Sequence, residues 1–214
     1  VVPLDDCRIW YRYHRLFADL LRARLEDLYP ERVPMLHRRA SAWYEDAAML
    51  DDAIKHAIAG EDLVHVAHIV ETHGRSLLLR GELNTLLRWV AALPPAMIED
   101  SARICTIHAW ALLLTGQTGG IAPRLQRAAH LLETAPEDPL WGDIAVIRAY
   151  GAAQQGDVPR TVALANRALD CLPPTRQGER GVAFFVLGGA HLLEGDWAAA
   201  ADALDKAATI GQAG

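Results

Sequence analysis

The C-terminal half of the chain repeats one pattern at a nearly constant spacing. Gly116, Gly156 and Gly195 follow one another at intervals of 40 and 39 residues, and an alanine follows each glycine twelve residues later. Each unit contains an apolar run, a turn of glycine and polar residues, and a second run rich in alanine and leucine. A fixed period of this length is typical of an α-helical repeat array. Because such repeats stack into a curved surface, the array is suited to hold a ligand or a partner.

The composition predicts an all-α fold of helical hairpins that can include a short β-strand at the N-terminus. Alanine and leucine dominate, and both residues enter a helix at little cost. The spacing of apolar residues predicts helices near 102–115, 120–134, 140–155, 158–172, 179–194 and 197–210. The strand is expected at residues 8–13, where large aromatic residues and isoleucine crowd together.

Several turns have the chemistry of helix ends. Gly156 and Gly195 suit a left-handed position after a helix, and the aspartate that follows each of them can cap the next helix. Asp51 is expected to cap a short helix that Gly60 ends. The alanine twelve residues after each glycine should let two helices approach closely, so a bulky residue there should destabilise the fold.

Composition excludes several classes of protein. The 214 residues can bury a substantial core, and no apolar run approaches the length of a membrane span. The formal net charge of −6 argues against a wholly basic surface for nucleic acid. Three scattered cysteines are expected to be reduced thiols of a cytoplasmic protein. The missing initiator methionine and the ending in mid-pattern suggest a piece of a longer protein.

The spacing of glycine and alanine resembles the tetratricopeptide pattern, whose small residues are also twelve apart. The period here is five or six residues longer than the usual 34, and the aromatic positions are largely missing. The resemblance therefore implies a degenerate, tetratricopeptide-like right-handed superhelix of helical hairpins and no particular ligand.

A second resemblance lies near the N-terminus. The run from Trp10 to Arg22, WYRYHRLFADLLR, resembles a segment of the large ATP-binding LuxR-type transcriptional regulators, the family of the maltose-regulon activator. His37-Arg38-Arg39-Ala40 with Trp43, and the run from Asp52 to Ala57, also resemble that family. The resemblance implies the end of a winged-helix region at 1–29, a helical linker and start of the superhelix at 30–94, and degenerate repeats at 95–214.

The same resemblance sets expectations for cofactors and partners. The sequence has no G-x-x-x-x-G-K-[ST] phosphate loop, so we expect no cofactor in this chain and ATP only in a separate ATPase domain. Expected partners are the other domains of the parent regulator and a small-molecule inducer or protein effector. We expect no direct contact with nucleic acid and no membrane association, while self-association through the ends of the array stays open.

Two aromatic residues are candidates for ligand binding. Trp110 and Tyr150 each precede a turn glycine by six residues and should project alike. An aromatic side chain on the inner wall of a superhelix can anchor a ligand. Packing between repeats is the favoured alternative for these two residues, as it is for Trp141 and Trp197.

Arg12, His14 and Arg15 are candidates for an interdomain contact, because they lie at the expected junction of strand and helix. The competing interpretation of His14 is a partly buried histidine beside packed Tyr13 and Phe17, and we favour it. For the arginines of the N-terminal region we favour a solvated helix face over a docking face for another domain, and contact with DNA comes last.

The sequence gives little support to a metal site or a catalytic site. His65 and His68 are three residues apart, with Glu61, Glu71 and His73 nearby, but a zinc site needs three or four ligands and the sequence has no H-E-x-x-H or C-x-x-C motif. No serine lies in a G-x-S-x-G motif, and turns and helix ends explain the paired carboxylates. We therefore expect a non-catalytic, effector-sensing and protein-interaction segment of a LuxR-type regulator. A tetratricopeptide-like adaptor unrelated to transcription is the alternative.

Overall fold

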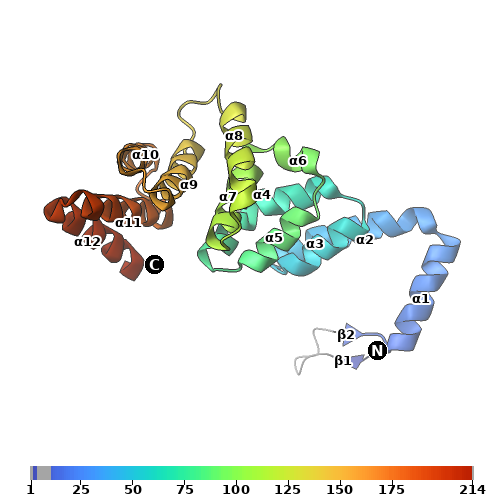
Figure 1. The fold of residues 1–214 in the computed structure, drawn as a ribbon. Helices are drawn as coiled ribbons and strands as arrows, with labels where there is room; N and C mark the ends of the chain where they lie inside the picture. The colour runs from blue at the N-terminus through green and yellow to red at the C-terminus, as the bar shows by residue number, and fades with distance from the viewer. Residues whose placement is uncertain (1, 4–10, 214) are drawn as a thin grey trace. The chain divides into compact units, whose positions relative to one another are not determined.

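The structure is a computed structural model that describes residues 2–3 and 11–213, with side chains for 13–212. These residues are almost entirely helical, as the sequence predicts (Figure 1). They fall into two compact units, of which one ends at Ile69 and the other begins at Val70.

The first unit begins with a two-stranded antiparallel ribbon. Strand β1 (Val2–Pro3) pairs with β2 (Tyr11–Arg12), with Pro3 opposite Tyr11. The strand predicted at 8–13 is thus confirmed at Tyr11 and Arg12, while positions 8–10 lie outside the described residues. The helices that follow are α1 (Arg15–Leu28), the 3-10 turn η1 (Pro30–Arg32), α2 (Val33–Asp46), α3 (Leu50–Ala59) and the start of α4 (Leu63–Leu79).

Helices α2 and α3 form a hairpin held by two polar contacts, of which the one made by Ser41 is buried. The Ser41 hydroxyl donates to the Ala53 carbonyl at 2.7 Å, and Arg38 Nε donates to the Gly60 carbonyl at 2.8 Å. Gly60 ends α3 as predicted. A Cβ at Gly60 would lie 3.0 Å from the Arg38 side chain and 3.0 Å from the Pro34 carbonyl oxygen, so close approach favours glycine there.

The prediction that Asp51 caps α3 is wrong. Met49 occupies the capping position without a side-chain hydrogen bond, and Asp51 lies inside the first turn beside Asp52. Carboxylates in the first turn still interact favourably with the positive end of the helix dipole.

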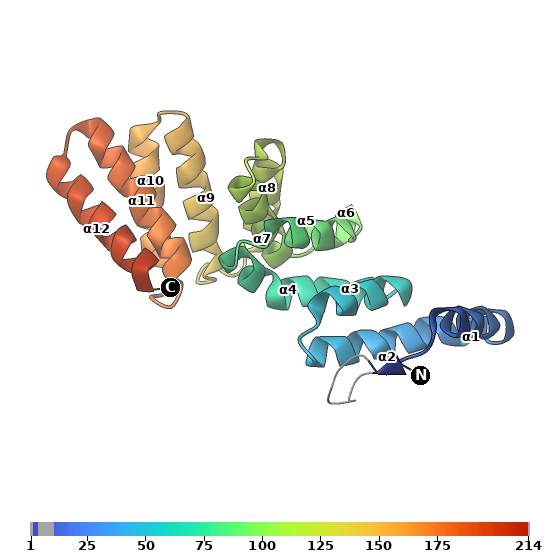
Figure 2. The same cartoon turned by 90° about the horizontal axis from the view of Figure 1, so that it is seen from below.

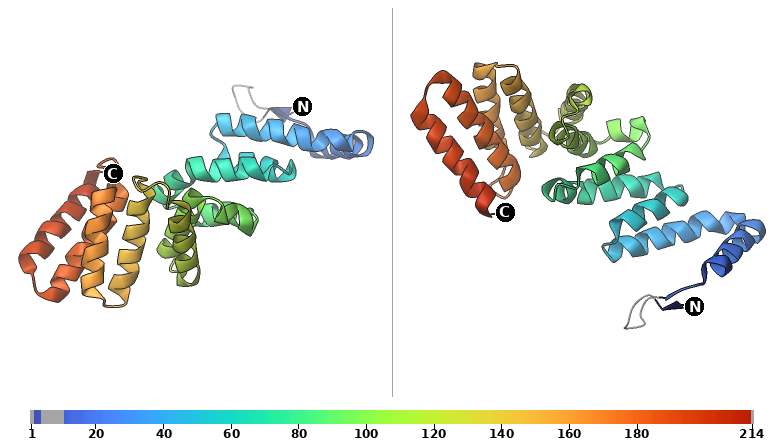
Figure 3. Two further views of the ribbon diagram at one scale, coloured as in Figure 1. Left: turned by 90° about the horizontal axis from the view of Figure 1, so that it is seen from above. Right: turned by 60° about the horizontal axis from the view of Figure 1, so that its bottom comes forward.

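The second unit is built from antiparallel helices joined by short turns. After the end of α4 come α5 (Leu83–Ala91), α6 (Pro95–Glu99), α7 (Ala102–Leu114), the 3-10 turn η2 (Thr118–Gly120), α8 (Ile121–Leu131), α9 (Leu140–Gln154), α10 (Val158–Cys171), α11 (Gln177–Glu194) and α12 (Trp197–Ala213). Figures 2 and 3 show α9, α10, α11 and α12 side by side, and each contacts the next. The predicted stacking of helical hairpins is confirmed.

The three spaced glycines lie at the turns of three hairpins, α7–α8, α9–α10 and α11–α12. Gly116, Gly156 and Gly195 have φ values of 74°, 73° and 81°, the left-handed conformation that a glycine adopts without strain. Asp157 and Asp196 then accept hydrogen bonds from the backbone N–H three residues on, at 3.2 and 3.0 Å. The prediction of a glycine turn followed by an aspartate cap is therefore confirmed at both places.

The small residues of the repeat are buried where a further helix follows. Ala128 and Ala168 are fully buried, whereas Ala207 is only half-buried on α12, the last described helix. Helices α7 and α9 have neighbours on several sides and bury most of their residues. The short helix α6, which begins at Pro95, was not predicted.

Candidate functional site

A chain of charged and aromatic side chains, some buried and some half-buried, joins four helices of the second unit. Its members are Arg75 on α4, Trp110 on α7, Asp143 on α9, Arg176 just before α11 and Glu179 on α11. Asp143 and Glu179 are 3% and 8% exposed, which is unusual for carboxylates and requires that each be paired. We call these five residues the charge network.

Each oxygen of Asp143 has its own donor. Trp110 Nε1 donates to Oδ1 at 3.0 Å, and Arg176 Nη2 donates to Oδ2 at 2.6 Å. The carboxylate therefore connects α7, α9 and the turn before α11. Because a buried polar group without partners is costly, these two bonds fix the positions of the Trp110 indole and the Arg176 guanidinium.

Glu179 is held by two arginines. Arg75 donates from Nε to Oε1 at 2.7 Å and from Nη2 to Oε2 at 3.0 Å, which is a two-pronged pair. Arg176 Nη1 lies 3.4 Å from Oε1, so Arg176 bridges Glu179 and Asp143. The network thus has two carboxylates and two guanidinium groups and carries no net charge when all four are ionised.

The two carboxylates differ in their acidity. Burial raises the pKa of Asp143 to about 6, against the opposing effect of Arg176 and the Trp110 hydrogen bond. Burial also opposes ionisation of Glu179, but the hydrogen bonds from Arg75, a backbone hydrogen bond and the charges of Arg75 and Arg176 together outweigh it and keep the pKa of Glu179 below its ordinary value. Asp143 is therefore the member of the network whose protonation responds to mildly acidic pH.

Three adjoining cavities meet at the charge network, and Arg75 lines all of them. The largest, about 760 Å³, runs between α11 and α12 and is lined by Leu79, Phe185 and Ile210 among others. The other two, about 230 and 200 Å³, lie against Trp110 and Glu179. We call the three together the groove: it combines apolar walls with charged groups at one end, as small-molecule sites do.

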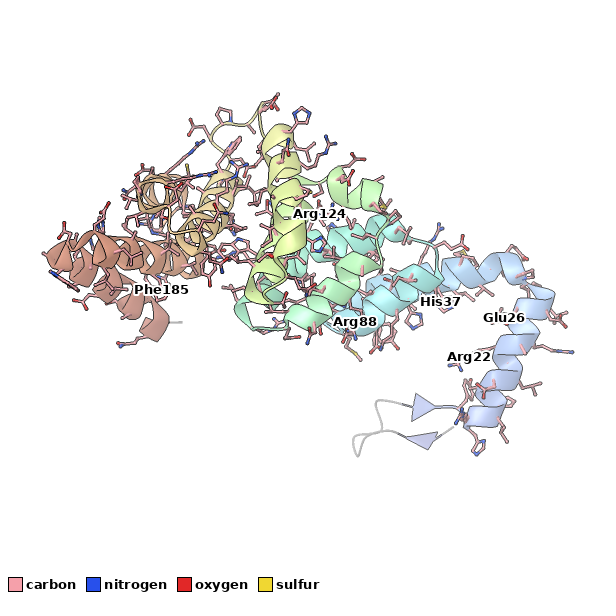
Figure 4. All side chains as sticks on the ribbon, in the orientation of Figure 1. Arg22, Glu26, His37, Arg88, Arg124 and Phe185 are labelled. Atoms are coloured by element: carbon pink, nitrogen blue, oxygen red, sulfur yellow. The ribbon has the colours of Figure 1, made fainter. Side chains whose placement is uncertain are left out.

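Phe185 is the most prominent apolar side chain of the groove. It projects from α11 in Figure 4 and is 60% exposed, and Leu79 on the wall formed by α4 is 59% exposed. Exposed large apolar side chains that line a concavity are frequent binding anchors.

Of the two predicted ligand residues, only Trp110 lies at the groove. It is 6% exposed, with its indole N–H bound to Asp143. Tyr150 lines another cavity, of about 420 Å³, which shares Phe185 with the groove but does not reach Trp110. Tyr150 also packs against the core of Ala149, Ala165 and Val186. The structure does not bring the two aromatic residues to one site.

The predicted interdomain residues lie at the start of α1. Arg12 is on β2, and its side chain lies outside the described residues. His14 is exposed and precedes α1 without a side-chain cap, so the interpretation as a partly buried histidine is wrong. Arg15 is exposed, 4.0 Å from Asp19, and Tyr13 packs edge-on against Phe17 as expected.

The histidine pair of α4 lies beside a carboxylate. His65 and His68 lie 3.2 and 3.9 Å from the carboxylate of Glu45 on α2. Within the described residues, no three His, Cys, Asp or Glu side chains are arranged to hold a metal ion. Across the same part of the chain, no helix combines the length and apolar character that crossing a bilayer would require.

Sequence reasoning missed the residues of the network other than Trp110. Arg75, Asp143 and Glu179 are distant in sequence, so no local motif links them. A weaker signal was available: Asp143 and Glu179 each lie four residues before a core residue, Ile147 and Ala183, on an apolar helix face. A carboxylate on such a face must find a buried partner.

Comparison with known proteins gives two findings. Residues 1–33 match the family described as the MalT winged helix domain. The chain is also 35% identical over 187 residues to proteins named serine/threonine-protein kinase PknK, from two strains of Mycobacterium tuberculosis and from Mycobacterium bovis. This similarity covers 83% of the chain and only 17% of the length of these relatives. The findings support a relation to MalT-like proteins.

Proposed function

We propose that the chain is the effector-sensing and protein-interaction segment of a LuxR-type bacterial transcriptional regulator and is not itself catalytic. The observation that carries the proposal is the groove with the charge network at one end, in a chain whose first 33 residues match the MalT winged helix domain. Within the proposal, the protein is cytoplasmic and its partners are the other domains of the regulator and an inducer or protein effector.

The charge network supplies a mechanism for sensing. It touches α4, α7, α9 and α11, so a ligand that contacts Arg75 or Glu179 acts on the packing of all four helices. A ligand shifts an equilibrium between two packings only through its different affinity for them. An occupant that competes for the Arg75–Glu179 pair would supply that difference.

The non-catalytic part of the proposal rests on sequence motifs. The chain has no phosphate loop, and it has neither the H-R-D nor the D-F-G triplet of protein kinases. Since the kinase relatives are matched over 17% of their length, we assign the activity in their name to other parts of those proteins. We likewise place ATP binding in an ATPase domain outside this chain.

Two measurements test the proposal. The gene should encode a phosphate loop upstream of this segment and a helix-turn-helix downstream, and the absence of both would contradict it. In calorimetry, the 214-residue chain should give no binding heat with ATP. Binding of ATP to the chain would overturn the assignment of nucleotide binding to another domain.

The second candidate is a tetratricopeptide-like adaptor that grips a peptide or a partner helix, with no link to transcription. The exposed apolar side chains of Phe185 and Leu79 in the groove favour it. The flanking gene sequence separates the two, because an adaptor needs neither an ATPase nor a DNA-binding domain.

A further inference from the structure

Three arginines lie along the seam between α9 and α10, away from the groove. Arg160 and Arg167 are seven residues apart on α10 and therefore lie on one face of that helix. Arg148 is on α9, which is the antiparallel partner of α10 in its hairpin. We call Arg148, Arg160 and Arg167 the arginine stripe.

The register of the hairpin brings the three arginines together. The Arg167 guanidinium lies over the Trp141 ring, 5.7 Å from its centroid, and so fixes one point of contact between the helices. Arg148 lies seven residues after Trp141 on α9. Arg160 lies seven residues before Arg167 on α10. Because the helices run antiparallel and seven residues are two turns, Arg148 lies opposite the face of α10 that carries Arg160 and Arg167, and the charges of both arginines act on it.

Among the described residues, no guanidinium group of the stripe forms an ion pair with a carboxylate, although the Arg160 backbone N–H donates to Asp157 at 3.2 Å. Arg148 reaches only the Leu125 carbonyl, with Nη2 at 3.5 Å, and Arg167 has the Trp141 ring. Burial, together with the like charges of Arg167 and Arg160, lowers the pKa of Arg148. Neighbouring arginines differ: Arg124, labelled on α8 in Figure 4, lies 3.6 Å from Glu99, and Arg127 lies 3.3 Å from Asp100.

The three guanidinium groups lie close together without a carboxylate counterion, although the chain has a formal net charge of −6. Such a group of positive charges is suited to bind an anion that is not part of the described chain. We propose that the arginine stripe binds a phosphate monoester, carried by a small molecule or by a phosphorylated side chain. Guanidinium groups present paired N–H donors that fit phosphate oxygens, and a dianionic monoester offers three such oxygens.

The size of the stripe favours a single phosphate group over nucleic acid. Arg160 and Arg167 are about 10 Å apart along α10, from a rise of about 1.5 Å per residue. A nucleic acid strand needs a basic track over several phosphates, and the acidic chain as a whole repels a polyanion.

Phosphorus NMR tests the proposal with O-phosphoserine and inorganic phosphate as probes. Both should bind the wild-type chain. Arg160→Gln and Arg167→Gln should each weaken binding by about tenfold, the effect of losing a charge-assisted hydrogen bond. Both side chains are exposed, so the variants should keep the helical circular dichroism of the wild type. Arg24→Gln, which removes an exposed positive charge on α1, is the matched control and should bind normally.

Comparison of the probes identifies the source of the phosphate. Tighter binding of O-phosphoserine than of inorganic phosphate points to a phosphorylated side chain, and equal binding points to a small phosphorylated ligand. The proposal is overturned if neither probe binds at millimolar concentration, if the stripe variants bind as well as Arg24→Gln, or if a single-stranded oligonucleotide binds the stripe while both probes do not. The stripe is separate from the groove, so its failure would leave the proposed function standing.

Discussion

Helices α1 and α9 are of nearly equal length, 14 and 15 residues, yet they have opposite environments. Helix α1 buries none of its residues, although Leu16 and Leu20 give it an apolar face, and they are 75% and 61% exposed. Helix α9 buries eight residues among its neighbours α7, α8, α10 and α11. An amphipathic pattern therefore predicts a helix, but burial depends on the helices that surround it.

The difference in burial between α1 and α9 also distinguishes their charged residues, which are exposed on α1 and enclosed on α9. On α1 the ion pairs of Asp19 with Arg15 and Arg22 are exposed, and such pairs contribute little to stability. On α9 the charge of Asp143 is enclosed and must be paired, and this enclosure is what creates the charge network.

The largest expected effect comes from the apolar residues of the two helices. Ile147→Ala on α9 should lower the free energy of unfolding by about 3–4 kcal/mol, because the side chain is 1% exposed and its removal leaves a cavity. Leu20→Ala on α1 should change it by less than about 0.5 kcal/mol. Urea denaturation measures both changes. Equal losses of unfolding free energy would contradict the claim that α9 is buried and α1 is exposed.

The next effect concerns paired charges. Glu179→Ala should cost about 3 kcal/mol, because it leaves Arg75 without its carboxylate partner in a half-buried site and leaves Arg176 with Asp143 alone. The matched control is Glu82→Ala, which removes the partner of Arg80 from an exposed pair and should cost less than about 1 kcal/mol. If the two variants unfold at the same urea concentration, the charge network contributes no more to the free energy of unfolding than an exposed ion pair does.

Two glycines of α9 allow a closely packed position and an open position to be compared within one helix. A Cβ at Gly142 would lie 2.5 Å from Leu172 Cγ and 3.2 Å from the Leu172 backbone N, so Gly142→Ala should destabilise the chain by about 2 kcal/mol. A Cβ at Gly151 would point into open space, with no packing neighbour within 4 Å, so Gly151→Ala should stabilise the chain by about 0.5–1 kcal/mol. Thermal unfolding should move in opposite directions, and a gain at Gly142 would show that the helices are not closely packed there.

The smallest effect is a dependence on pH. The folded-state pKa of Asp143 is raised to about 6 from 3.8, so the folded chain binds this proton more tightly than the unfolded chain does. Its contribution is therefore present below about pH 4 and is lost as the pH rises to about 6. Asp143→Asn should reduce that loss by about 1–2 kcal/mol between pH 4 and 6. Identical pH profiles for variant and wild type would contradict the raised pKa.

Local features of the fold could be predicted from the sequence, and the site could not. The left-handed glycines and aspartate caps at Gly156-Asp157 and Gly195-Asp196 follow from neighbouring residues, so they were predicted correctly. The capping prediction failed at Asp51, where Met49 precedes the helix and two adjacent aspartates compete for one role.

The charge network depends on contacts between distant segments. Arg75 and Glu179 are 104 residues apart, and nothing near either one in the sequence identifies the other. Trp110 could be singled out because of its place relative to Gly116, but its bond to Asp143 depends on how α7 packs on α9. The same positional argument applied to Tyr150 leads to a different cavity.

The central claim is that the charge network makes four helices respond together, as the proposed sensing function would require. Hydrogen–deuterium exchange of the wild type and Glu179→Gln tests it most directly. We predict faster exchange in α11 and also in α9, in α7 and in α4 after Val70, with α2 and α3 unchanged. Faster exchange confined to α11 would contradict the claim, because the network would then be a local contact and not a link between helices.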